Sequence, residues 1–215
     1  MPIVYGVNAS PFVRKVRVAL IEKNIPYELE TVFPGPMAPP DFRQLSPLGK
    51  VPAFRDGDRV LADSSVICAY LERVHPTPPL YPSDPYDYAR ALWFEEWADG
   101  GLVPVSGPKI FFQRVVGPRF FGRTTDEEVV RTAIEQELPP LFDYLESQLT
   151  GAEFLVGRTF TIGDIGVLTQ FVNLAHAGVS PDAARWPKLA AYVERGLARP
   201  SFAGLIAEEA PQYRS

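Results

Sequence analysis

The first third of the chain combines short segments with strand periodicity and a longer segment with helix periodicity. Residues 2–6 (PIVYG) are mostly β-branched or aromatic, which predicts a strand. Residues 13–24 carry apolar side chains at helical spacing and predict a helix. Residues 27–33 alternate apolar and polar positions as a second strand does. The chain is therefore expected to begin with a strand, a helix and a second strand.

A hairpin and a further helix are expected next. Residues 51–62 predict two short strands joined around Asp56, Gly57 and Asp58, a sequence that favours a tight turn. An aspartate and two serines then open a helix that runs to about Val74. With a helical turn in the proline-rich connection before the hairpin, the order is βαβ, α, ββα. This order contains one parallel crossover and one antiparallel hairpin, so we expect an α+β domain.

Prolines mark the end of this domain. Residues 75–85 (HPTPPLYPSDP) hold too many prolines for a helix to cross them, which predicts a stiff linker. The segments after them are helical, and the nearly apolar one at residues 161–178 is expected to be a buried central helix. We therefore expect an α+β domain over residues 1–76, a linker over residues 77–86 and an all-helical domain over residues 87–215.

Composition and charge narrow the class of protein. Of the 215 residues, 46% are hydrophobic and 12% are aromatic, which is enough to build a sizeable core. The formal net charge of −5 argues against a nucleic-acid-binding protein, which would normally carry a basic patch. The compact basic cluster of Arg14, Lys15 and Arg17 is interpreted as a solvated face of the first helix.

Cysteine use and the N-terminal pattern bear on location. Cys68 is the only cysteine, so no intramolecular disulfide can form and a reducing compartment is expected. It lies in an apolar helical run, where burial of the thiol is expected. The first residues lack the pattern of a signal peptide, and no apolar run approaches about 20 residues. We expect a cytoplasmic protein without a membrane partner.

Several common site chemistries have no matching motif. The chain shows no phosphate-binding loop, no dinucleotide-binding glycine pattern and no nucleophile elbow. His75 and His176 are far apart in sequence, and no Cys/His cluster predicts zinc. We therefore expect neither a triad hydrolase nor a metal site.

The junction between the first strand and the first helix carries Ser10 and Pro11. A serine is a good helix N-cap, and a proline suits the first helical position because its missing N–H has no partner there anyway. Alternatively, a hydroxyl at a helix N-terminus can hold an anion. The sequence of this junction permits both interpretations.

Two further features allow a structural and a functional interpretation. Pro52 can begin an edge strand, or it can follow a cis peptide bond that turns the backbone of Val51 outward to pair with an extended peptide. Asp63 and Ser64 can cap the next helix. They can also bind an amino group and a carboxylate, through the acid and through the hydroxyl with the helix N–H groups.

The order and spacing of these features, followed by a proline-rich linker and a helical domain, resemble the serine-type cytosolic glutathione S-transferases. The matching stretches are NASPFVRKVRVAL, SPLGKVPAF, LADSSVICAYLE and TFTIGDIGV. The resemblance covers nearly the whole chain and implies an α+β thioredoxin-like domain followed by an all-α domain. In the last stretch, Thr161 and Asp164 match a structural capping box.

The resemblance implies that Ser10 is the catalytic residue and that glutathione is the co-substrate, without a metal. In the serine-type enzymes this hydroxyl stabilises the thiolate of glutathione. The first four residues of the helix region read Ser10, Pro11, Phe12 and Val13, so they lack the cysteines needed for disulfide exchange. Tyr5, in the first strand, and Asn8 are rival partners for the sulfur.

The resemblance also implies the binding residues. Val51, before Pro52, would pair with the cysteinyl backbone of glutathione, and Lys50 would meet the glycyl carboxylate. Asp63 and Ser64 would hold the γ-glutamyl end, with Asp63 standing where many relatives have glutamate. The second substrate, a small hydrophobic electrophile, would lie against an apolar wall. The candidates for this wall are Phe12, Val105, Phe111 and Phe112.

We therefore predict a glutathione S-transferase. Because the relatives are usually dimers, the resemblance also implies a homodimer. One alternative is a glutathione-dependent isomerase of the maleylacetoacetate type, although the NASPF turn is poorer in serine and cysteine than in such isomerases. Another is a non-catalytic member of the same fold that binds glutathione, a ligand or another protein. The intact set of glutathione-binding residues favours the first function.

Overall fold

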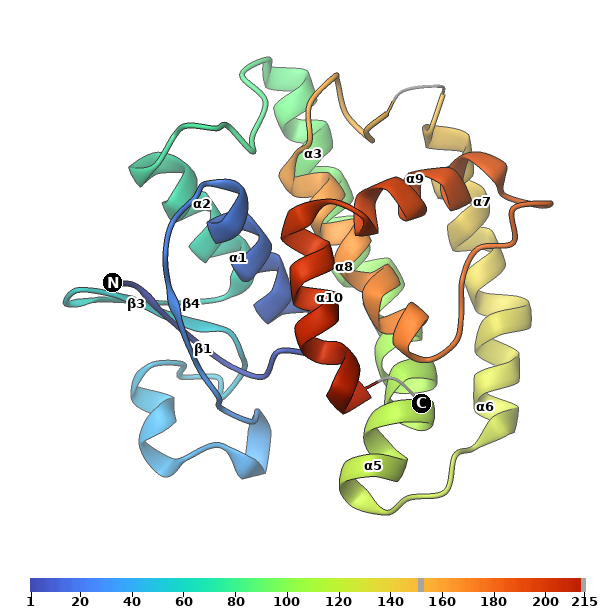
Figure 1. Cartoon of the computed structure of the whole chain (residues 1–215), viewed down its shortest axis with the longest axis horizontal. Helices are drawn as coiled ribbons and strands as arrows, with labels where there is room; N and C mark the ends of the chain where they lie inside the picture. The colour runs from blue at the N-terminus through green and yellow to red at the C-terminus, as the bar shows by residue number, and fades with distance from the viewer. Residues whose placement is uncertain (151–152, 214–215) are drawn as a thin grey trace. The chain divides into compact units, whose positions relative to one another are not determined.

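The computed structural model of the chain describes residues 1–150 and 153–213 (Figure 1). The chain divides into two compact units, residues 1–80 and residues 81–215. The linker bounds expected from the sequence, residues 77–86, stay a prediction.

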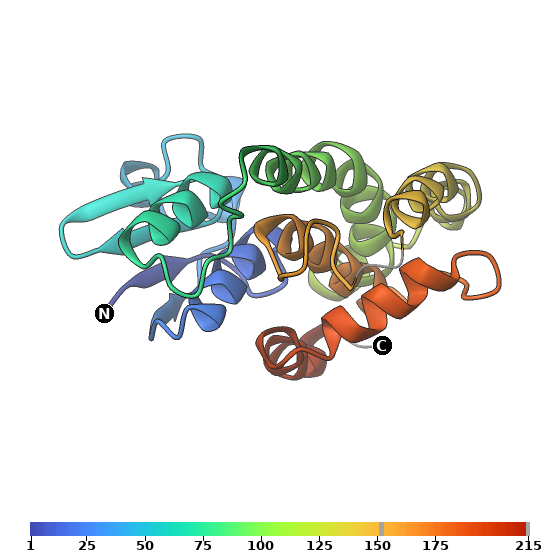
Figure 2. The ribbon, with the colours of Figure 1, turned by 90° about the horizontal axis from the view of Figure 1, so that it is seen from above.

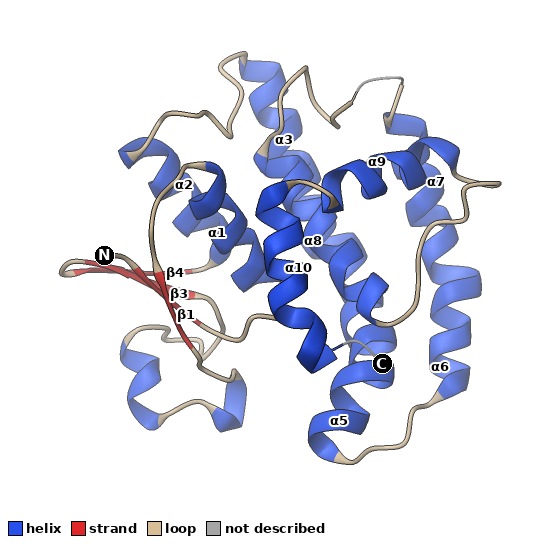
Figure 3. Cartoon of the chain, in the orientation of Figure 1, coloured by secondary structure: helices blue, strands red, loops and turns tan. Residues whose placement is uncertain are grey.

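The first unit combines a four-stranded sheet with helices (Figure 3). Its elements are β1 (Ile3–Tyr5), α1 (Pro11–Glu22), β2 (Glu28–Glu30), two 3₁₀ turns (Gly35–Met37 and Pro40–Gln44), β3 (Ala53–Asp56), β4 (Arg59–Ala62) and α2 (Ser64–Val74). The strand order is β2-β1-β3-β4, with β1 parallel to β2 and antiparallel to β3, and with β3 antiparallel to β4. The expected crossover and hairpin are confirmed.

Strand alternation divides the core of the first unit between the two faces of the sheet. Val4 pairs with Phe54, and both are fully buried. Tyr5 points to the other face, because successive side chains in a strand alternate. There it clusters with Val32 and Phe42, from the connection between β2 and β3. This cluster gives the proline-rich connection a fixed place beneath the sheet.

The basic cluster on α1 is buried, so its interpretation as a solvated face is wrong. Arg14, Lys15 and Arg17 are at most 5% exposed. The ammonium of Lys15 donates to Ser65 Oγ on α2 at 3.2 Å, and Arg17 Nε donates to the Tyr27 hydroxyl at 2.8 Å. Long cationic side chains can be buried in this way when their stems pack and their heads find acceptors. The partners come from other segments, which charge patterning along one helix does not reveal.

Lys23 joins the end of α1 to the end of α2 and to the residues that follow. Its ammonium is fully buried and contacts the carboxylate of Glu72 at 2.7 Å. It also donates to the carbonyl oxygens of His75 and Pro78 at 2.8 and 2.9 Å. The same carboxylate oxygen of Glu72 accepts from the N–H of Leu80 at 3.2 Å. The proline-rich segment is therefore anchored at its start by one lysine.

Replacing Lys23 by methionine is expected to lower the free energy of unfolding by about 3 kcal/mol, because the largely buried carboxylate of Glu72 loses its ion pair and two carbonyls lose a donor. The matched control is Lys109→Met, which removes the ion pair between Lys109 and Glu137. The side chains of these two residues are 40% and 32% exposed, respectively. An exposed pair of this kind contributes roughly 0.2–1 kcal/mol. Urea unfolding followed by circular dichroism compares the two variants. Equal losses would show that Lys23 is no more than a surface lysine in its energetic effect.

The second unit is helical throughout its regular segments. Its α-helices are α3 (Pro85–Trp97), α4 (Val103–Val105), α5 (Gly117–Phe121), α6 (Glu127–Thr132), α7 (Leu138–Gln148), α8 (Ile162–His176), α9 (Pro187–Leu197) and α10 (Pro200–Tyr213). In the described part of this unit, three π-helical segments connect some of them, at Ala98–Leu102, Ser106–Val116 and Ala133–Glu137. Among the described residues, no helix is both long enough and apolar enough to cross a membrane.

Helix α8 is the buried central helix that the apolar run predicts. Every residue from Ile162 to Leu174 is buried. The helix lies between α3 and α9 (Figure 2). Gly163 permits the close approach of α3, because a Cβ at this position would lie 2.9 Å from the Ala91 carbonyl oxygen.

The N-terminus of α8 is fixed by the expected capping box. The buried carboxylate of Asp164 accepts hydrogen bonds from the N–H and the hydroxyl of Thr161, at 2.9 and 3.0 Å. It also accepts from the N–H of Leu155 and the hydroxyl of Tyr192, each at 2.9 Å. Burial raises the pKa of Asp164, and these hydrogen bonds oppose that rise. The structural role expected for Asp164 is confirmed.

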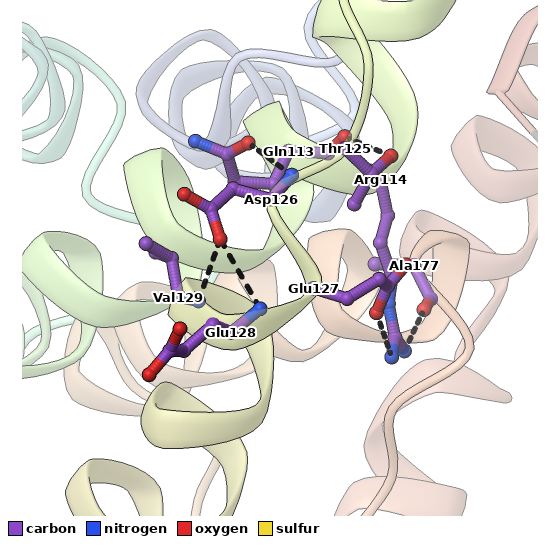
Figure 4. A network of polar contacts seen from close by, with 8 residues as sticks. All are labelled: Gln113, Arg114, Thr125, Asp126, Glu127, Glu128, Val129 and Ala177. Carbon is purple, nitrogen blue, oxygen red and sulfur yellow. Dashed lines mark hydrogen bonds and ion pairs between the residues drawn. The ribbon is translucent and has the colours of Figure 1, made fainter.

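A second aspartate, Asp126, caps α6 at the surface of the same unit (Figure 4). Its carboxylate accepts from the N–H groups of Glu128 and Val129, each at 3.1 Å. Its own N–H donates to Gln113 Oε1 at 3.2 Å, and the neighbouring hydroxyl of Thr125 donates to the Gln113 carbonyl at 2.9 Å. The connection between α5 and α6 is therefore held by local polar contacts.

Candidate functional site

The candidate residues of the first unit gather at one edge of its sheet. Tyr5 at the end of β1 pairs with Ala53 at the start of β3, which in turn pairs with Ala62 at the end of β4. The residues that follow β1, precede β3 and follow β4 therefore lie side by side. Helices α1 and α2 both begin near this edge. The N–H groups of their first turns have no partner within the helix. The residues at the edge are Ser10, Val51, Pro52, Asp63 and Ser64.

Ser10 is the N-cap of α1. Its backbone is extended (φ −68°, ψ 123°), and its Oγ accepts a long hydrogen bond of 3.4 Å from the N–H of Val13. Pro11 occupies the first helical position, as expected. A hydroxyl has two lone pairs and one hydrogen, so accepting from the helix does not use its O–H. The capping interpretation and the anion-binding interpretation are therefore compatible.

The peptide bond between Val51 and Pro52 is cis. Strand β3, which follows it, lies between β1 and β4, so the alternative that Pro52 begins an edge strand is wrong. Lys50, which precedes Val51, has an exposed side chain. Its backbone carbonyl accepts a hydrogen bond from the Ser46 hydroxyl at 2.7 Å. The backbone here is fixed, and the ammonium of Lys50 extends into solvent.

Asp63 caps α2 in a rare backbone conformation. Its φ is +79° and its ψ is +128°, a region that non-glycine residues seldom occupy. Its Oδ1 accepts from the N–H groups of Ser65 and Val66, at 2.9 and 3.2 Å. Ser64, at the first helical position, is 3% exposed. The capping role is confirmed, and Oδ2 is the oxygen of Asp63 that remains outside these bonds.

Of the two rivals of Ser10, Tyr5 is a core residue. Its side chain is 4% exposed and packs with Val32 and Phe42, with the guanidinium of Arg55 5.7 Å from the ring centre. Asn8 lies in the turn between β1 and α1.

The residues predicted to form an apolar wall lie in both units. Phe12 is half-buried in the first turn of α1. In the second unit, Val105 and Phe111 are 7% and 6% exposed, and Phe112 is half-buried. The ring of Phe111 packs at 6.4 Å from that of His176, as a core aromatic does. The electrophile pocket stays a prediction.

Two features beside the candidate site have no signal in the sequence. One is the contact of Lys15 with Ser65, which links α1 to α2 next to the cap of α2. The other is Gly6, which lies against both Val13 and Val51. In the sequence, a glycine after a predicted strand indicates only that the strand ends there. The contacts of Gly6 and of Lys15 are therefore visible only in the tertiary structure.

The candidate site rests on hydroxyls, backbone groups and helix N-termini. Across residues 1–150 and 153–213, His, Cys, Asp and Glu side chains form no group of three placed to hold a metal ion. Such a donor set suits an extended, negatively charged organic ligand, whose carboxylates bind helix N-termini and whose backbone pairs with a strand.

Known proteins resemble this chain in sequence and in fold. Over residues 4–79 the chain matches the family described as glutathione S-transferase, N-terminal domain, and over residues 114–209 glutathione S-transferase, C-terminal domain. Mouse glutathione S-transferase theta-3 is 31% identical over 186 residues, which cover 85% of this chain and 76% of that protein. The wheat glutathione S-transferase is 29% identical over 221 residues, 100% of this chain and 97% of that protein.

Two solved structures extend the comparison. Human glutathione-S-transferase T1-1 in its apo form has a TM-score of 0.84 at 27% identity, over 98% of this chain and 88% of that one. A glutathione S-transferase from Methylobacterium radiotolerans, in complex with glutathione sulfonate, has a TM-score of 0.77 at 30% identity, over 95% and 94%. The matches in sequence agree with the observed fold, a sheet with helices followed by a helical unit. The chain belongs to the glutathione S-transferase family.

Proposed function

We propose that this protein is a glutathione transferase in which the Ser10 hydroxyl donates a hydrogen bond to the glutathione thiolate, which then attacks a small hydrophobic electrophile. The supporting observation is that Ser10 Oγ caps α1 as an acceptor, which leaves its O–H free of that bond and able to donate. The thiol proton leaves to solvent, and the thiolate sulfur forms a bond to the electrophilic carbon. In an addition, a π bond of the electrophile opens and the electron pair takes a proton from solvent; in a substitution, the leaving group departs with the electron pair of its bond to carbon.

The energies are sufficient for this role. A thiol with a pKa near 8.5 is only a few per cent ionised at neutral pH, and lowering the pKa by about 2 units requires roughly 2.7 kcal/mol. A hydrogen bond to a charged group contributes roughly 1.5–3 kcal/mol. The N-terminus of α1 adds about 0.3–1 kcal/mol for a negative charge. One serine at a helix start therefore accounts for the activation.

The rest of glutathione is proposed to bind along the same edge of the sheet. Val51 would pair with the cysteinyl backbone and the exposed Lys50 would meet the glycyl carboxylate. Ser64 and the N-terminus of α2 would bind the γ-glutamyl carboxylate, and Asp63 Oδ2 its ammonium. The similarity to a relative solved with glutathione sulfonate supports this ligand class.

Replacing Ser64 by alanine is expected to raise the KM for glutathione roughly 10- to 100-fold, because one hydrogen bond to a carboxylate is lost. The kcat should stay nearly constant, since this contact is equally present in the ground state and in the transition state. Lys50→Ala is the graded comparison, with an increase of at most about fivefold for a solvated ion pair. A fall in kcat at unchanged KM for Ser64→Ala would contradict the assignment.

Calorimetry of glutathione binding, combined with an ultraviolet titration of the bound thiol, tests the proposed function directly. Binding with a thiolate band at neutral pH supports the transferase. Binding without the band would indicate a glutathione carrier, and no binding at millimolar glutathione would leave a non-catalytic member of the fold. Family membership also leads us to propose a homodimer in the cytoplasm. Light scattering, which measures the molar mass in solution, tests the dimer, and cell fractionation tests the location.

A further inference from the structure

We propose that Gly6 is a positioning residue that sets the distance between the two parts of the protein that bind the cysteine of glutathione. This inference rests on the proposed function. Gly6 follows β1 with a φ of +153°, which favours glycine. Its N–H donates to the carbonyl of Glu30 at 2.9 Å, so the residue is held to the sheet.

The space around Gly6 excludes any side chain. A Cβ at this position would lie 2.4 Å from Val13 Cγ2 and 3.1 Å from Val51 Cβ. Ordinary contacts between carbon atoms are about 3.5–4.0 Å long, so a methyl group would force its neighbours apart. Both neighbours belong to the candidate site: the N–H of Val13 donates to Ser10, and Val51 precedes Pro52.

One residue of the ligand has to reach both of these parts. In the proposed complex, the sulfur of the cysteine contacts Ser10 and the backbone of the same cysteine pairs with Val51. Covalent bonds fix the reach from that backbone to its sulfur, so the protein must match it. A hydrogen bond weakens steeply when its length or angle departs from the favoured range. Gly6, packed between Val13 and Val51, keeps the spacing short.

Gly6→Ala is expected to move the pKa of the bound thiol toward that of free glutathione. A misplacement of about 1 Å can cost up to roughly 100-fold in rate, so we expect kcat/KM near neutral pH to fall roughly 10- to 100-fold. The affinity for S-methylglutathione, which has no thiolate to stabilise, should change much less. Ultraviolet titration and calorimetry measure the two quantities.

Gly57→Ala is the matched control. Gly57 has a φ of +59° in the turn between β3 and β4, and a Cβ there would meet no described atom within 4 Å. Alanine at this position also takes a positive φ but meets none of the contacts, so the variant should lose some stability and keep the wild-type thiol pKa. A loss of the thiolate in both variants would mean that general destabilisation is responsible, and would overturn the role of Gly6.

If Gly6→Ala does not fold, Gly6→Ala/Val13→Ala carries the test, because it removes the nearest contact and keeps the one with Val51. Its thiol pKa should be higher than in the wild type, with S-methylglutathione still bound. A wild-type thiol pKa in either folded variant overturns the inference alone. If the wild-type protein itself forms no thiolate, the proposed function is wrong and the role of Gly6 is overturned with it.

Discussion

Replacing Ser10 by alanine is expected to lower kcat/KM for glutathione conjugation roughly 10- to 150-fold near neutral pH, because the thiolate loses a charged hydrogen bond worth about 1.5–3 kcal/mol. The affinity for glutathione should change little, since Val51, Asp63 and Ser64 are untouched. Steady-state kinetics and calorimetry on the same preparation separate the two effects. Wild-type activity in the variant would contradict the serine mechanism and favour Tyr5 or Asn8.

The pH dependence makes this result specific. In the wild type the pKa of the bound thiol is expected to lie below its ordinary value, whereas in Ser10→Ala it should return toward about 8.5. The rate depends on the ionised fraction, so the difference should be largest at low pH and should shrink as the pH rises through the pKa of the variant. Ser10→Thr, which keeps a hydroxyl that can cap the helix and donate, is the conservative control and should retain most of the activity.

Loss of the α1 cap by itself affects the stability of the protein and not the ionisation of the bound thiol. Removing a serine N-cap costs roughly 0.5–2 kcal/mol of stability. This cost lowers the unfolding midpoint of Ser10→Ala and leaves the pH profile of the folded enzyme unchanged. A variant that is less stable but has a wild-type pH profile would therefore show that Ser10 is only a cap.

Replacing Asp164 by alanine is expected to have the largest effect on stability, about 4–5 kcal/mol. The buried carboxylate accepts from two N–H groups and two hydroxyls, and each buried donor left without an acceptor costs about 1–3 kcal/mol. Urea unfolding followed by tryptophan fluorescence is a suitable measurement. The tryptophans, Trp93, Trp97 and Trp186, all belong to the second unit.

Asp126→Ala is the matched control, because it also removes an aspartate that caps a helix in the same unit. The hydrogen bonds of Asp126 to Glu128 and Val129 are exposed, so water can replace the lost acceptor. The expected loss is about 1 kcal/mol. If the two variants were equally destabilised, burial would not be the reason for the importance of Asp164.

The sequence by itself predicted the features that depend on near neighbours. Ser10 and Pro11 predicted the start of α1, Asp63 the cap of α2, and the pair Thr161 and Asp164 the capping box of α8. In each case the interacting atoms lie within one helical turn of each other in the chain. The hairpin of β3 and β4 follows from its turn residues in the same way. The spacing of these motifs was enough to indicate the family.

Only the tertiary structure decided the features whose partners are distant in the chain. Lys15 meets Ser65, Lys23 meets Glu72, and both lysines are buried although their charge predicts exposure. Gly6 bears on the candidate site only because Val13 and Val51, which are distant from each other in the chain, both lie against it. The free energy of a charge or of a missing methyl group depends on what surrounds it, and burial and hydrogen bonding across the fold set those surroundings. A local pattern holds no information about a neighbour that arrives from 50 residues away.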